Sequence, residues 1–147
     1  MTLRFAFPLL TLLLLSCSSG QDLVLEGEEP FFSNIRQLTF EGENAEGYFS
    51  FDEKHFIYQR THPSANEQCD QIWTYDLKSG YQKRISSGKG RTTCSYYLPG
   101  DSLVLYATTE AGGPDCPPPP DMSHGYTWAI YPDYDIVLAD TTGRTIR

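Results

Sequence analysis

The sequence has few basic residues, few methionines and no long apolar segment. Lysine and arginine together number 11 against 19 acidic residues, which gives a formal net charge of −8 over 147 residues. This balance disfavours a nucleic-acid partner, because a phosphate backbone is held by clustered basic side chains and these are scattered along the chain. Only 2 Met occur beside 12 Gly, 10 Tyr and 8 Phe, a composition that indicates a folded, β-rich chain rather than a disordered one.

The longest apolar run follows Arg4 and covers only residues 5–15. A permanent transmembrane helix needs about 20 apolar residues, so this run indicates a secretory signal. The boundary Leu14-Leu15-Ser16-Cys17 resembles the bacterial lipobox, whose cysteine is acylated. We therefore expect a lipoprotein signal peptide over 1–16, lipidation of Cys17 and a polar tether over 17–30 that is attached to the membrane by lipid alone. The alternative is a plain signal peptide with a chance cysteine.

A repeat of about 48 residues follows the tether. Tyr48–Tyr58 aligns without gaps on Tyr96–Tyr106, and Ile72–Asp76 matches Ile136–Asp140. Each of the latter segments is followed by a turn that contains glycine. Self-similarity at a period of about 40–50 residues is typical of β-propellers.

Each unit holds four short apolar and aromatic runs with no sustained helical period, which is the pattern of a propeller blade. In the first unit these runs cover Ala45–Ser50, His55–Arg60, Gln71–Asp76 and Gln82–Ser86. The sequence therefore predicts an all-β fold of about two four-stranded antiparallel blades, over 40–86 and 88–147, within an incomplete propeller covering 31–147. An irregular β-sandwich with chance similarity is the alternative.

The first unit also resembles a known family. Phe49–Tyr58 resembles the Phe-Ser-Pro-Asp-Gly-Lys motif of TolB-type, WD40-like propellers, and Ile72–Gly80 is similar to the third strand and following turn of that repeat. Glu53 stands where the family has glycine, so we expect a looser turn there. The resemblance implies a role in envelope translocation or cell-envelope assembly. A lipid anchor departs from soluble TolB.

No catalytic residue is predicted, because Gly-x-Ser-x-Gly is absent and His55 lies inside an apolar run. The leading hypothesis is a non-enzymatic, exported lipoprotein, on the periplasmic face or the cell surface, that binds a protein or peptide of the envelope without a cofactor. The alternative is the N-terminal propeller of a prolyl-oligopeptidase-type hydrolase truncated at Arg147. A polysaccharide lyase built on the propeller is a third, weaker option.

The unusual residues gather in connections that we expect on one face. Propeller strands alternate in direction, so loops between second and third strands share a face with the links between blades. These connections are Thr61–Asp70, Ser87–Cys94 and Thr108–Asp133. The candidate partner-binding residues on this face are His62, Asp70, Lys89, Arg91 and His124.

The same face is expected to carry Cys69, Cys94 and Cys116. Export implies an oxidising compartment, where disulfides persist. We expect a Cys69–Cys94 bridge, with Cys94–Cys116 as the alternative, and the odd count leaves one free thiol or a partner elsewhere. A third interpretation makes the three cysteines metal ligands together with His62 and His124, but no CxxC or HxxxH spacing supports it and no metal site is predicted.

Length conflicts with the repeat. A closed propeller has about four to eight blades, and closure removes its exposed sheet edges. The segment from Asn34 onward holds two units at most, with a leading strand over 34–39. We therefore expect a truncated product of a longer gene, or a piece that depends on a partner.

Overall fold

The structure, a computed structural model, describes residues 23–146 and divides into two units, 1–37 and 38–147. The described part of the first unit, 23–37, contains turns and no strand. The predicted signal peptide and Cys17 lie outside the described residues, as does part of the predicted tether. No helix within 23–146 combines the length and hydropathy needed to cross a bilayer.

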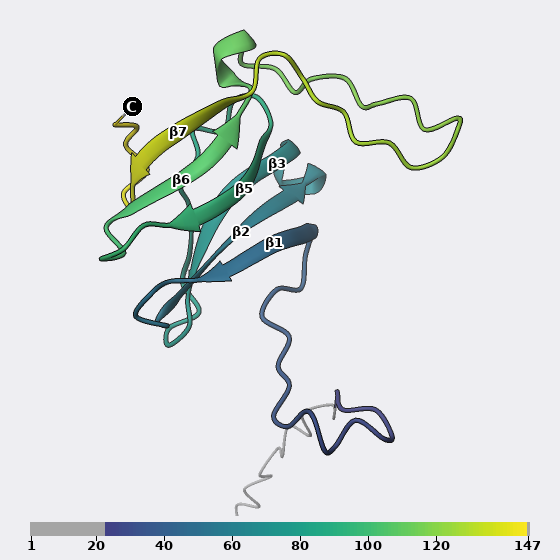
Figure 1. The fold of residues 1–147 in the computed structure, drawn as a ribbon, viewed down its shortest axis with the longest axis vertical. Helices are drawn as coiled ribbons and strands as arrows, with labels where there is room; N and C mark the ends of the chain where they lie inside the picture. Colours follow the sequence, from purple (N-terminus) through teal and green to yellow (C-terminus); the bar gives the residue numbers. More distant parts are fainter. Residues whose placement is uncertain (1–22, 147) are drawn as a thin grey trace, which may run out of the picture. The chain divides into compact units, whose positions relative to one another are not determined.

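The second unit carries two antiparallel sheets (Figure 1). The first sheet has the order β1-β2-β3-β4 and the second the order β5-β6-β7, so each strand pairs with its neighbour in sequence. We call these sheets the first and second blades. The strand bounds are β1 Glu43–Phe49, β2 His55–His62, β3 Glu67–Asp76, β4 Gln82–Arg84, β5 Thr92–Tyr97, β6 Leu103–Thr108 and β7 Asp135–Asp140.

These sheets confirm the predicted all-β fold class. In the second blade, the expected fourth strand is represented by a single isolated bridge from Ala139 to Thr145. The segment around Thr145 therefore pairs with β7 at the place where β4 pairs with β3 in the first blade. Two antiparallel sheets of four and three strands are the arrangement expected of incomplete propeller blades.

The two blades have the same register. Ile57 faces Thr74 in the first blade, and Leu105, 48 residues after Ile57, faces Leu138 in the second. Both inner strands carry a register shift at equivalent places, and the bulged residues Glu46 and Cys94 have φ of 49° and 50°. The similarity seen in the sequence is therefore a repeat of backbone geometry.

The turn between the first two strands does not loosen at Glu53. Glu53 and Asp101, 48 residues apart, both have φ of 57° and close the same kind of turn, so the prediction of a looser turn is wrong. The Asp101 carboxylate explains this, because it accepts hydrogen bonds from the amides of Phe51 at 2.8 Å and Asp52 at 2.9 Å. Charge-assisted bonds of this kind offset the steric cost of a left-handed non-glycine residue.

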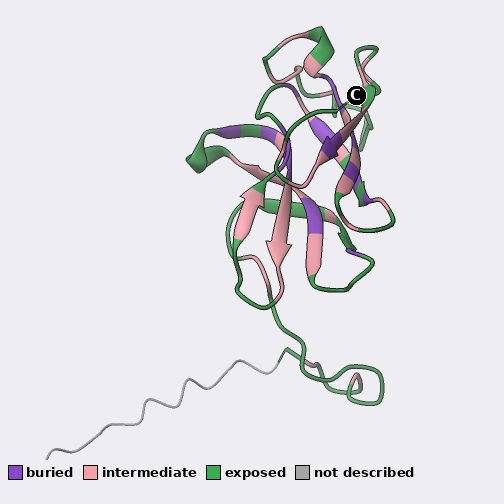
Figure 2. Cartoon of the chain, turned by 90° about the vertical axis from the view of Figure 1, so that its left-hand side faces the viewer, coloured by how far each residue is buried: buried purple, intermediate pink, exposed green. Residues whose placement is uncertain are grey.

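The hydrophobic core lies between the blades. Ile57, Ile72 and Ile85 of the first blade belong to one buried cluster with residues of the second blade, namely Tyr97, Val104, Tyr106 and Ala139. Figure 2 shows the buried stretches inside the two sheets and the exposed connections around them. Each buried aliphatic side chain stabilises the fold by about 1.5–3 kcal/mol, so this packing fixes one blade against the other.

Candidate functional site

Three connections meet at one end of the blades, which we call the loop face. They are the β2–β3 connection at 63–66, the β4–β5 link at 85–91 and the long β6–β7 loop at 109–134. The tight β1–β2, β3–β4 and β5–β6 turns lie at the opposite end, which we call the turn face. Figure 1 shows the β6–β7 loop reaching out from the sheets.

The base of the β6–β7 loop is fixed to the first blade. The Gly90 amide donates a hydrogen bond of 2.9 Å to the Pro114 carbonyl, which joins the loop to the interblade link. A disulfide between Cys69 in β3 and Cys116 in the loop, with Cα atoms 5.8 Å apart, adds a covalent connection. Both contacts hold the start of the loop beside β3.

The expected cysteine pairing is wrong, both in its first form, Cys69–Cys94, and in its alternative, Cys94–Cys116. The interblade link ends earlier than predicted, so Cys94 lies inside β5 at the bulge and is exposed as a free cysteine. The long loop instead brings Cys116 back to Cys69. The interpretation of all three cysteines as metal ligands also fails, because a disulfide occupies two of them.

A cavity of about 270 Å³ lies on the loop face. One wall is the β6–β7 loop, which contributes the aromatic side chains Tyr126, Trp128, Tyr131 and Tyr134. The other wall comes from both blades and includes Glu43, Asn44, Gln59, Asp70 and Arg91. Aromatic rings opposite a few polar groups are the usual composition of a binding pocket.

Of the five predicted partner-binding residues, the structure brings Asp70 and Arg91 together in this cavity. Arg91 Nη1 lies 3.3 Å from Asp70 Oδ2, and both residues line the wall. Arg91 Nε is buried and has no hydrogen-bond partner among the described atoms. The Asp70 contact at Nη1 therefore does not complete the hydrogen bonding of the guanidinium, and a buried N–H group without an acceptor costs free energy.

The other three predicted residues do not line the cavity. His62 is the last residue of β2, and its Nε2 lies 3.7 Å from Glu41 Oε2. Lys89 Nζ lies 3.6 Å from Glu110 Oε1. His124 is exposed within the β6–β7 loop. The structure thus separates these three side chains from the Asp70–Arg91 pair.

The aromatic side chains of the β6–β7 loop are not among the binding residues predicted from the sequence. Trp128 is 63% exposed and Tyr126 is 81% exposed, although large apolar groups at a loop normally find cover. Tyr131 donates a 2.6 Å hydrogen bond to the Pro118 carbonyl and its ring lies 5.9 Å from that of Tyr134, contacts that brace the loop. Burial raises the pKa of Tyr134. The sequence feature that could have indicated this wall of the cavity is the presence of four aromatic residues in one loop rich in proline and aspartate.

A buried ion pair between β2 and β3 was not predicted from the sequence either. Glu67, only 6% exposed, accepts hydrogen bonds from Arg60 Nε at 3.0 Å and from Trp73 Nε1 at 3.1 Å. Arg60 Nη2 lies 2.9 Å from the same carboxylate, and the guanidinium lies 3.6 Å from the centroid of the Trp73 ring. The sequence predicts a loop over Thr61–Asp70 that includes Glu67, whereas β3 begins at Glu67.

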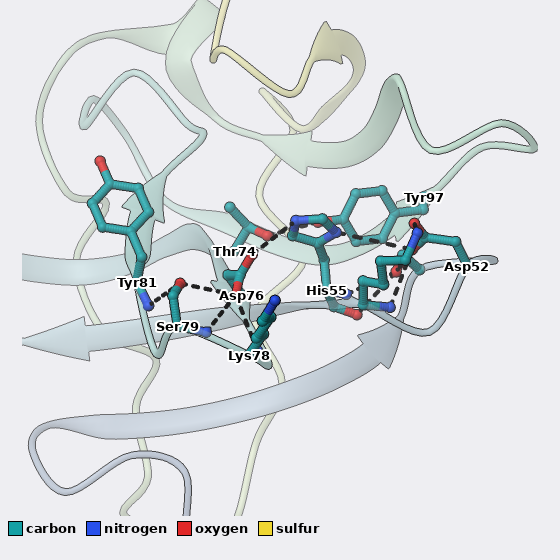
Figure 3. Close-up of polar contacts among 10 residues, drawn as sticks. Asp52, His55, Thr74, Asp76, Lys78, Ser79, Tyr81 and Tyr97 are labelled. Atoms are coloured by element: carbon teal, nitrogen blue, oxygen red, sulfur yellow. Dashed lines mark hydrogen bonds and ion pairs between the residues drawn. The ribbon is translucent and has the colours of Figure 1, made fainter.

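A different polar cluster occupies the turn face. Figure 3 shows His55 between two carboxylates, with Nε2 3.6 Å from Asp76 and Nδ1 3.9 Å from Asp52. A hydrogen bond from the Ser50 hydroxyl and others from Lys54 lower the pKa of Asp52 to about 2. The backbone amide and hydroxyl of Ser79 lower the pKa of Asp76. These contacts bring the β1–β2 turn and the β3–β4 turn together around His55.

Two antiparallel blades packed face to face, with the same register and a common core, define a β-propeller-like protein. No family model matches the sequence, and no curated protein matches it. Among solved structures, the chain is similar to a protein of Agrobacterium tumefaciens described as TolB, with a TM-score of 0.52 and 19% sequence identity. The match covers 72% of this chain, which spans 30% of that chain. The likeness supports a TolB-like fold.

Proposed function

We propose that the chain is an exported, lipid-anchored β-propeller protein that binds a protein or peptide of the cell envelope through the cavity on its loop face. Its role would be in envelope transport or assembly, as the resemblance to TolB implies. The observation that carries the proposal is the cavity itself, which is lined both by the exposed aromatic residues Tyr126 and Trp128 and by the Asp70–Arg91 pair. Aromatic residues and arginine are enriched where proteins bind proteins.

Two further observations support export and anchoring. The Cys69–Cys116 disulfide is compatible with an oxidising compartment outside the cytoplasm. The Leu14–Cys17 segment has the order of a lipobox, and acylation of Cys17 would attach the protein to a membrane. Metabolic labelling with a palmitate analogue tests the anchor: we expect label on the full chain and none on the Cys17→Ser variant. Equal labelling of both would contradict the anchor without affecting the cavity.

Partner binding is tested by capture after cross-linking in the envelope of the cells that produce the chain. We compare the full chain, its Trp128→Ala variant and a Tyr81→Ala variant, with an unrelated lipoprotein as background. Tyr81 is a matched control because it is 66% exposed and lies beside the β3–β4 turn, away from the loop face. We expect an envelope protein enriched over background by the full chain and by Tyr81→Ala, and lost with Trp128→Ala.

Two results would count against the proposal. The first is that no protein is enriched over the lipoprotein background. The second is that Trp128→Ala captures the same protein to the same extent as the full chain, because the cavity would then have no part in binding.

A further inference from the structure

Two of the aromatic residues that line the cavity on the loop face have no aromatic or cationic neighbour. Trp128 is 63% exposed and Tyr126 is 81% exposed. Tyr131 and Tyr134 contact each other, whereas no ring contact and no cation contact to Trp128 or Tyr126 occurs within residues 23–146. Both rings are therefore accessible to a ligand that stacks on an aromatic side chain.

Glu43 adds a carboxylate to the cavity wall that the blades form. It is the first residue of β1, it is exposed, and it forms no ion pair with any residue that the structure describes. Its partner across the β1–β2 pair is Thr61, whose hydroxyl donates a hydrogen bond to Asp70. Glu43 and Asp70 thus lie on one wall, where two carboxylates accompany the single guanidinium of Arg91.

The cations at this end of the blades are already paired. Arg91 Nη1 lies 3.3 Å from Asp70 Oδ2, and Lys89, outside the cavity, lies 3.6 Å from Glu110. The β6–β7 loop contains acidic residues and no lysine or arginine, and the chain as a whole has a net charge of −8. These charges make the potential at the cavity negative, so it attracts a cation and repels an anion.

The first blade shows how this chain holds a cation. The Arg60 guanidinium lies 3.6 Å from the centroid of the Trp73 ring, and Arg60 Nη2 lies 2.9 Å from the Glu67 carboxylate. The guanidinium thereby gains an aromatic face and a carboxylate, two groups to which arginine binds well. The cavity presents the same two groups, in Trp128 and Glu43, and no described residue supplies them with a cation.

We propose that the cavity binds an arginine side chain of the envelope partner, with its guanidinium stacked on the Trp128 ring and paired with the Glu43 carboxylate. This inference rests on the proposed function and names the group of the partner that enters the cavity. Arginine suits the site better than lysine, because a planar guanidinium stacks on a ring and donates two parallel hydrogen bonds to a carboxylate.

The test titrates the full chain, in mild detergent, with terminally blocked peptides and follows binding by calorimetry. The first peptide is Gly-Leu-Arg-Leu-Gly, and in three others citrulline, lysine or glutamate replaces the arginine. Citrulline keeps the planar shape of arginine and loses its charge. The same peptides are titrated into Glu43→Gln, Trp128→Ala and Glu53→Gln. Glu53→Gln is the matched control, because Glu53 is exposed in the β1–β2 turn at the opposite end and its replacement changes the net charge equally.

We expect the arginine peptide to bind the full chain and Glu53→Gln with the same affinity, and the citrulline peptide to bind about tenfold more weakly. The lysine peptide should be intermediate, and the glutamate peptide should bind most weakly. Glu43→Gln should weaken the arginine peptide by about tenfold and leave the citrulline peptide unchanged. Trp128→Ala should weaken both. Added salt should weaken the arginine peptide more than the citrulline peptide, because it screens charge pairing.

The proposal is overturned if the arginine peptide does not bind, if it binds no more tightly than the citrulline peptide, or if Glu43→Gln leaves its affinity unchanged. A glutamate peptide that binds most tightly would assign the cavity to an acidic partner instead.

Capture from the envelope separates this inference from the proposed function. An envelope protein that the full chain and Glu43→Gln capture equally, and that Trp128→Ala loses, would uphold the proposed function and overturn the role of arginine. The absence of any captured protein would instead contradict the proposed function itself.

Discussion

Removal of the Cys69–Cys116 disulfide should be among the most costly single changes in this chain. The bond joins residues separated by 47 positions and connects β3 of the first blade to the long loop of the second. For a closed loop of that size, the chain-entropy relation gives about 14 cal/mol/K, or about 4 kcal/mol at 25 °C. Cys116→Ser should therefore lower the free energy of unfolding by about 4 kcal/mol.

The assay is urea unfolding of the full chain, followed by tryptophan fluorescence. With an m-value of about 1.5 kcal/mol/M, the midpoint should fall by about 2–3 M. Cys94→Ser is the matched control: Cys94 is the exposed free cysteine, so its loss should change stability by less than about 0.5 kcal/mol. A reducing agent should lower the midpoint of the unmodified chain and leave that of Cys116→Ser where it is.

Unfolding of Cys116→Ser at the same urea concentration as the unmodified chain would show that the disulfide does not stabilise the fold. Peptide mapping without reduction gives a second check, which should recover Cys69 linked to Cys116 and alkylated Cys94. A linked peptide that contains Cys94 would restore the pairing that the structure replaces.

Three further predictions concern charged groups. Glu67→Gln removes the buried negative charge that pairs with Arg60, so the free energy of unfolding measured in urea should fall by about 2–3 kcal/mol. Glu67→Asp keeps the charge but shortens the side chain, and it should lower the free energy of unfolding by a similar amount. Asp101→Asn keeps a side chain that is tolerated at positive φ, but an amide cannot present two carboxylate oxygens to the amides of Phe51 and Asp52. Thermal unfolding should therefore show a loss of stability of about 1 kcal/mol. An unchanged melting temperature would contradict a stabilising role for these two hydrogen bonds. Hydrogen bonds, first among them those from hydroxyl groups, lower the pKa of Asp52 and of Asp140 to about 2 from 3.8. Because folding lowers these pKa values, both carboxylates stabilise the fold above pH 3.8, and this contribution is lost as the pH falls toward 2. The double variant Asp52→Asn, Asp140→Asn lacks both carboxylates. Its stability should therefore fall less between pH 4 and pH 2 than that of the unmodified chain, in acid titrations followed by circular dichroism.

The repeat could be predicted from the sequence because it depends on short segments of strand and turn, whose residue types are repeated 48 positions later. The matched segments Tyr48–Tyr58 and Tyr96–Tyr106 correspond in the structure to the same strand ends and the same turn. Each segment follows an equivalent bulge, at Glu46 or Cys94. Alternating apolar residues fix the side of a sheet that each position occupies, so aligned positions of the two units have equivalent places in their sheets.

The disulfide pairing could not be predicted in the same way. The expected loops put Cys94 at the end of the link that leads into the second blade, where it would bridge to Cys69, but β5 begins at Thr92 and holds Cys94 at a bulge. Cys116 reaches Cys69 only because the long loop returns to the first blade, a path that no local pattern encodes. The cavity was missed for a related reason, since its aromatic wall and its Asp70–Arg91 wall come from segments far apart in sequence.

Photo-cross-linking in living cells tests most directly the claim that the loop face binds an envelope partner. A photoreactive residue replaces Tyr126 on the wall of the cavity or, as the control, Tyr81 beside the β3–β4 turn, and both sites are exposed. We expect a discrete adduct with an envelope protein from position 126 and none from position 81. No protein adduct at position 126, or equal adducts at both positions, would contradict it.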